Sequence, residues 1–130
     1  MSMLLIIFLF IARDGGKEII VYALIAQSKV ELKNGLMHIK NRLPRDHGML
    51  FDFGNIRKHR IWMKNTYIPL DIIFLDMDYN VIGFIKNAKP LSEDLLMINK
   101  ESRYVLETNG GWSERINLKR GDHITIKKII

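Results

Sequence analysis

The feature that most constrains the fold is a regular alternation of strand-like runs and turn signals from Met49 to the end of the chain. The runs are rich in apolar and β-branched residues, and Gly, Asn and Asp separate them at intervals of about eight to twelve residues. The expected strands are residues 49–53, 60–64, 70–76, 81–85, 103–107 and 123–129. This pattern predicts a mainly-β fold, a compact antiparallel β-sandwich or barrel.

One or two short helices are expected beside the strands. Ser28 and Glu31 have the spacing of a capping box, in which the serine oxygen accepts an amide and the glutamate reaches back. This pattern predicts a helix over residues 29–34, ended by Gly35. Residues 112–118 favour a second short helix. The chain has 130 residues, which is enough for one domain with its own core and too few for two.

The chain opens with an unbroken apolar run over residues 3–12. A bilayer-spanning helix needs about 20 such residues, so no stable transmembrane anchor is expected. The length suits a signal peptide, although no Lys or Arg precedes the run and bulky Phe10 lies near the possible cleavage site. We expect residues 1–16 to be a signal-like lead and residues 17–130 a single mainly-β domain. A buried first strand and an extension outside the domain are the alternatives.

This prediction makes the protein exported or part of the cell envelope, in the periplasm, and cytoplasmic if the run is not a signal. The chain contains no cysteine, which excludes a disulfide scaffold, a thiolate zinc site and a cysteine nucleophile. The four histidines are scattered and no phosphate-binding loop is present, so neither a metal site nor a cofactor is expected.

The net charge of +6 lies entirely in the first half of the chain, because residues 66–130 contain equal numbers of cations and anions. The cations are densest over residues 57–60. Such a cluster can mark a nucleic-acid surface, but a solvated face is the commoner explanation. Nucleic-acid binding is therefore the weakest functional hypothesis, since few aromatic residues alternate with the charges elsewhere.

A more informative segment surrounds Trp62. If residues 60–64 form a strand, Trp62 and Lys64 share a face suited to stacking or to cation–π contact, with ordinary core packing as the alternative. Asp71 begins an otherwise apolar strand and needs a polar partner. Lys64 and the amides of Asn65 and Thr66 are the nearest candidates in the sequence, so Asp71 either stabilises the turn or serves a site.

Together these segments resemble a bacterial and archaeal family catalogued as domain of unknown function 192. The resemblance covers about residues 19–127 and is most specific in the string Trp62-Met63-Lys64-Asn65-Thr66, followed by Ile68-Pro69-Leu70-Asp71. It also includes Gly48-Met49-Leu50-Phe51-Asp52-Phe53, Tyr104-Val105-Leu106-Glu107 and Gly121-Asp122. The resemblance implies a compact mainly-β domain with a short helix near its start and, in many relatives, a signal peptide. It implies no activity.

The leading hypothesis is a small β-domain that binds a small ligand or a protein partner. The candidate binding residues are Trp62, Lys64, Asn65, Thr66, Asp71, His47 and Glu107. The alternative is an enzyme in which Lys64 and Asp71 form an acid–base pair, joined by His47 or Glu107. No recognised catalytic spacing supports the enzyme, and no catalytic residue is assigned.

Overall fold

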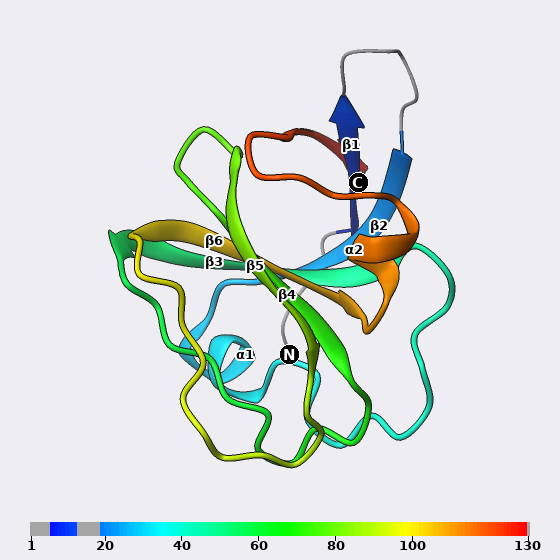
Figure 1. The fold of residues 1–130 in the computed structure, drawn as a ribbon, viewed down its shortest axis with the longest axis vertical. Helices are drawn as coiled ribbons and strands as arrows, with labels where there is room; N and C mark the ends of the chain where they lie inside the picture. The colour runs from blue at the N-terminus through cyan, green and yellow to red at the C-terminus, as the bar shows by residue number, and fades with distance from the viewer. Residues whose placement is uncertain (1–5, 13–18, 130) are drawn as a thin grey trace.

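The computed structural model describes residues 6–12 and 19–129, which form one curved sheet and two short helices (Figure 1). The elements are β1 (Ile6–Ala12), β2 (Ile19–Ala26), α1 (Lys29–Asn34), β3 (His47–Arg57), β4 (Leu70–Leu75), β5 (Val81–Ala88), β6 (Ser102–Asn109), α2 (Trp112–Arg115) and β7 (His123–Ile129). The mainly-β prediction with short helices is confirmed. Ser28 and Glu31 form both halves of the capping box at the start of α1. None of the helices within the described ranges has the length and apolarity to cross a membrane.

The seven strands lie in the order β5-β4-β6-β3-β2-β1-β7. Neighbouring strands are antiparallel except β2 and β3, which run parallel, so the sheet is mixed rather than purely antiparallel. The connection between β2 and β3 contains α1, since two parallel strands need a crossover segment between them. The edge strands β5 and β7 approach each other through an isolated bridge between Asn80 and His123, and the sheet is not closed into a barrel.

The apolar run at the start of the chain contributes β1 to this sheet. β1 lies between β2 and β7 and pairs antiparallel with both. Its residue Phe10 is opposite Ile20 of β2 on one side and Thr125 of β7 on the other. Residues Ile6–Ala12 therefore form a strand of the sheet, as in the first-strand alternative. The domain boundary at residue 16 and the removal of residues 1–16 as a signal stay predictions.

The sheet has a hydrophobic core on each face because β4 and β6 are buried on both sides. Side chains alternate along a strand, so Ile73 belongs to one core and its neighbour Ile72 to the other. Trp112 of α2 packs into the first core. Leu36, which follows α1, and Met63, in the loop over residues 58–69, pack into the second. The segment containing α2 therefore packs on the face of the first core, and the segment containing α1 packs on the face of the second.

The strand predicted over residues 60–64 is wrong. These residues belong to the 58–69 loop, in which Ile61 makes only an isolated bridge with Leu96. The loop is held by the loop over residues 89–101: the Met63 amide donates to Ser92 O over 3.0 Å, and the Leu91 amide donates to Thr66 O over 2.9 Å. The two loops lie side by side at the lower end of the molecule in Figure 1, close to α1.

Candidate functional site

A cavity of about 200 Å³ lies between α1, β3, β6 and the 58–69 loop. Three of the predicted site residues, Trp62, Thr66 and Glu107, line it together. The rest of the lining consists of Leu32, Lys33, Asn34, Gly35, Leu36, Met37, Phe51, Phe53, Arg60, Ile61 and Leu70. The cavity therefore has mainly apolar walls and a single acidic group.

That acidic group, Glu107, is the unusual feature of the cavity. It lies in the middle of the sheet on β6, opposite Ile72 of β4 and Met49 of β3, and only 4% of its surface is exposed. Among the described residues, no group donates a hydrogen bond to its carboxyl or forms an ion pair with it. Burial raises the pKa of Glu107 from 4.5 to about 8. Burial therefore favours the protonated form of Glu107, whose side chain lines the cavity.

The end of α1 reaches this carboxyl because residue 35 is glycine. Gly35 has a φ of +48°, and a Cβ built on it would lie 2.9 Å from Cζ of Phe51 and 3.9 Å from Oε1 of Glu107. Any side chain would therefore occupy the cavity and strain the backbone. The chain after α1 is tied to the 58–69 loop, since the His38 amide donates to Asn65 O over 2.7 Å.

Positively charged side chains surround the opening of the cavity. Lys33 and Arg60 are exposed lining residues. Lys64 Nζ lies 5.0 Å from the centre of the Trp62 ring, a cation–π distance that the two side chains reach within a loop rather than on the predicted strand. The lining thus combines two exposed cations and an aromatic ring with a buried acid, Glu107, whose protonated form burial favours.

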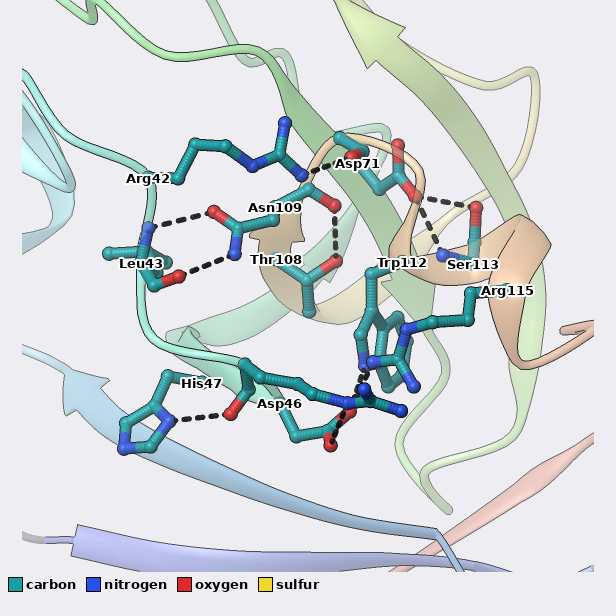
Figure 2. A network of polar contacts seen from close by, with 12 residues as sticks. Arg42, Leu43, Asp46, His47, Asp71, Thr108, Asn109, Trp112, Ser113 and Arg115 are labelled. Atoms are coloured by element: carbon teal, nitrogen blue, oxygen red, sulfur yellow. Dashed lines mark hydrogen bonds and ion pairs between the residues drawn. The ribbon is translucent and has the colours of Figure 1, made fainter.

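Asp71 is buried on the opposite face of the sheet, where it joins β4 to α2 (Figure 2). Its Oδ1 accepts from the amides of Asn87 and Gly111 over 2.9 and 3.2 Å. Its Oδ2 accepts from the Ser113 amide over 2.8 Å and from Ser113 Oγ over 2.6 Å. All four donors belong to the protein fold, so Asp71 fixes the start of α2 and does not face the cavity.

The predicted pair of Lys64 and Asp71 is not formed, because Lys64 lies over the Trp62 ring and all four donors to Asp71 come from other residues. His47 is also separate from the cavity: it stacks on Tyr22 with ring centroids 5.2 Å apart, and both line another cleft. Asn65 does not line the cavity, and its backbone oxygen accepts from the His38 amide. No group of three His, Asp or Glu side chains able to hold a metal converges in the part of the chain that the structure describes.

A second polar network, also drawn in Figure 2, joins the segment before β3 to α2. Asp46 Oδ1 accepts from the Trp112 indole over 3.0 Å and from Arg115. Burial acts to raise the pKa of Asp46, but these hydrogen bonds and the charges of Arg115 and Arg45 lower it below its usual value. Asn109 exchanges hydrogen bonds with both backbone groups of Leu43. These contacts stabilise the fold.

Sequence reasoning missed several residues of the cavity, notably Gly35, Phe51 and Phe53. Gly35 was expected as the terminator of α1, and the two phenylalanines as part of a strand. The available signal was the period of two, which places Phe51 and Phe53 on one face of β3. The sequence does not show the register between β3 and β6. In the structure Phe51 pairs with Val105, and this register places the two phenylalanines on the same face of the sheet as Glu107.

The comparisons with known proteins agree with this architecture. The chain matches the family domain of unknown function 192, described as "Uncharacterized ACR", over residues 10–126. A crystal structure from Sinorhizobium meliloti 1021, described as a "putative transcription regulator", is 33% identical with a TM-score of 0.89, covering 93% of each chain. A protein of unknown function from Novosphingobium aromaticivorans DSM 12444 is 32% identical with a TM-score of 0.85, covering 92% of this chain and 84% of that one. None of the curated proteins matches the chain. By sequence and by fold, this chain belongs to the domain of unknown function 192 family.

Proposed function

We propose that this domain binds a small organic molecule in the cavity above Glu107. The observation that supports this proposal is the carboxyl itself, which is 4% exposed, lines the cavity and has no partner among the described residues. Burying a polar group without a hydrogen bond costs several kcal/mol, on the order of 2–7 depending on the reference state. A ligand that supplies the missing hydrogen bond recovers part of that cost. A site with mainly apolar walls and one oriented polar group is typical of small-molecule binding.

An enzymatic role has less support in this cavity. Acid–base chemistry usually needs a second group within hydrogen-bond reach of the substrate. Among the described residues, the other titratable groups of the lining are the exposed Lys33 and Arg60. Asp71, the partner that the sequence suggested, contributes its oxygens to α2 instead. Binding without a chemical step is therefore the better proposal.

Nucleic-acid binding is the weaker candidate, although one similar structure is described as a transcription regulator. In the basic stretch, Arg57, Lys58 and Arg60 are exposed, but His59 is buried and stacks on Phe53 at 3.9 Å. Three cations neutralise few phosphates, so we expect DNA or RNA binding to disappear at about 0.15 M salt. If sub-micromolar affinity for DNA or RNA is retained at that salt concentration, nucleic-acid binding becomes the better proposal.

The proposal is tested by NMR titration of the isotope-labelled full chain with single-ring molecules of different charge, namely benzoate, 4-hydroxybenzoate, tyramine and 4-hydroxybenzyl alcohol. The two tryptophans provide an internal comparison: Trp62 lines the cavity, whereas Trp112 lies in the core on the other face. We expect at least one molecule to move the Trp62 indole signal and leave that of Trp112 in place. If none of the four moves it at millimolar concentration, the proposal fails.

Two variants check that binding occurs in this cavity. Gly35→Ala places a methyl group against Phe51 and Glu107, and Gly54→Ala is its matched control, since Gly54 has a φ of +74° and open space around its Cβ position. We expect Gly35→Ala to abolish binding and Gly54→Ala to retain it. If Gly35→Ala does not fold, Glu107→Leu removes the polar floor instead. Unchanged binding in Glu107→Leu would contradict the proposal.

A further inference from the structure

The chemistry of the cavity also specifies a class of ligand, in an inference that rests on the proposed function. At its floor, the Glu107 side chain has no hydrogen-bond or ion-pair partner among the described residues. A carboxyl group that retains its proton has one donor and keeps acceptor capacity. The complementary ligand group is an uncharged one that both donates and accepts, such as a hydroxyl. A ligand group of either charge would have to be buried at the floor, which is unfavourable unless it is paired.

The walls specify the body of the ligand. Phe51, Phe53 and Leu70 contribute apolar surface from the sheet, and Leu36 and Trp62 contribute it from the segments that cover the sheet. A cavity of about 150 Å³ is enough to hold benzene. The volume here is about 200 Å³, which suits one ring, or an aliphatic group of similar size, with a substituent at each end.

The opening specifies the outer end of the ligand. Lys33 and Arg60 are the exposed cations of the lining, and Lys64 lies outside the lining, over the Trp62 ring. Glu107, at the floor, is the one acidic side chain among the lining residues. A carboxylate at the opening faces two cations, whereas an ammonium group there faces like charges. Electrostatic complementarity therefore favours a ligand with a negatively charged outer end.

We infer that the cavity takes a small organic carboxylate, with its charge at the opening between Lys33 and Arg60 and an apolar body against Phe51 and Trp62. The end of the body opposite the charge carries a hydroxyl or a similar uncharged group, which exchanges hydrogen bonds with Glu107. The molecule has about ten non-hydrogen atoms, given the size of the cavity.

The four molecules used above separate the parts of this inference. 4-Hydroxybenzoate has both polar ends, benzoate lacks the hydroxyl, 4-hydroxybenzyl alcohol lacks the charge, and tyramine reverses it. We expect 4-hydroxybenzoate to bind about tenfold more tightly than each of the others, as expected for about 1.4 kcal/mol of added interaction. If tyramine or the alcohol binds as tightly as 4-hydroxybenzoate, the inference is wrong and the proposed function stands. If none of the four moves the Trp62 signal, both fail.

Substitutions assign each end of the ligand to its residues. Glu107→Leu should remove the preference for 4-hydroxybenzoate over benzoate, because the hydroxyl loses its partner. Lys33→Gln and Arg60→Gln should each weaken 4-hydroxybenzoate binding about fivefold and leave 4-hydroxybenzyl alcohol unchanged. The control is Lys29→Gln, also on α1 but outside the lining. If Lys29→Gln weakens binding as much as Lys33→Gln, the charge effect is general and the placement of the carboxylate is overturned.

Discussion

Two buried carboxyl groups on neighbouring strands have opposite surroundings in this protein. Asp71 of β4 is fully buried and accepts four hydrogen bonds on the α2 face of the sheet. Glu107 of β6 is almost as buried on the α1 face and accepts none from the described residues. The register places Asp71 opposite Thr108 and Ile72 opposite Glu107, so the two carboxyls project from opposite sides of the same pair of strands.

The comparison teaches that burial alone does not identify a functional carboxyl. The cost of burying Asp71 is offset within the fold, because each of its oxygens has two donors. The burial of Glu107 is accommodated by a proton instead, which the raised pKa reflects. Asp71 has its partners within the fold, whereas Glu107 has none among the described residues and is the carboxyl that we propose for the ligand site.

The largest effect is expected from Asp71→Ala. The variant removes a fully buried carboxylate and leaves the amides of Asn87, Gly111 and Ser113 without their acceptor, of which Ser113 is buried. We expect a loss of about 4 kcal/mol in the free energy of unfolding, measured by urea denaturation. The control is Asp78→Ala, in the exposed turn after β4, which should cost less than about 1 kcal/mol. Similar losses in the two variants would contradict a structural role for Asp71.

The next effect is the dependence of stability on pH that Glu107 imposes. The pKa of this acid is higher in the folded state, so the folded protein binds more protons than the unfolded chain between pH 4.5 and about 8. The free energy of unfolding is therefore unaffected by Glu107 ionisation below about pH 4.5, and it falls as the pH rises through this window. Relative to Glu107→Gln, the wild type should lose roughly 3 kcal/mol between about pH 5 and pH 8. Urea denaturation at several pH values measures this difference, and parallel curves would contradict it.

A smaller effect is expected from Ser113→Ala, which removes the hydroxyl donor of Asp71 and keeps the amide donor. We expect a loss of about 1.5 kcal/mol, since a hydrogen bond to a charged group contributes about 1.5–3 kcal/mol. The same variant should leave ligand binding in the cavity unchanged, because Ser113 lies on the other face. A large effect on binding would show that the two faces are coupled.

The smallest effect is expected from Lys64→Met. The lysine contacts the Trp62 ring and has no ion pair among the described residues, so stability should change by less than about 0.5 kcal/mol. A double-mutant cycle with Asp71→Asn should give a coupling energy close to zero. A coupling above about 1 kcal/mol would restore the pair that the sequence suggested.

Much of the fold was predictable because local signals determine it. The capping box specifies α1, and β7 matches its predicted range of residues. The segment over residues 60–64 was not predictable, because its hydrogen bonds go to the 89–101 loop and no local pattern records them. An apolar run of ten residues is compatible with a signal peptide and with a strand, so its composition does not distinguish them.

The site was predictable in part. The candidates Trp62, Thr66 and Glu107 line the cavity, whereas Asp71 lies on the other face of the sheet. Asp71 and Glu107 are both acidic residues within apolar strands, and their sequences do not indicate which has partners. The donors of Asp71 lie up to 42 residues away, at Ser113, and only the folded sheet brings them together. Asp71 and Glu107, which the sequence suggested for one site, therefore lie on opposite faces of the sheet.

The most direct test of this account is an NMR titration of the Glu107 carboxyl carbon in the full chain, assigned by comparison with Glu107→Gln. We expect a midpoint near pH 8 in the free protein, because burial disfavours the charged form. We also expect saturating 4-hydroxybenzoate to change this signal and to leave the Asp71 carboxyl signal in place. A midpoint near the ordinary value of 4.5, with no response to any of the four ring molecules, would contradict the assignment of Glu107 as the binding carboxyl.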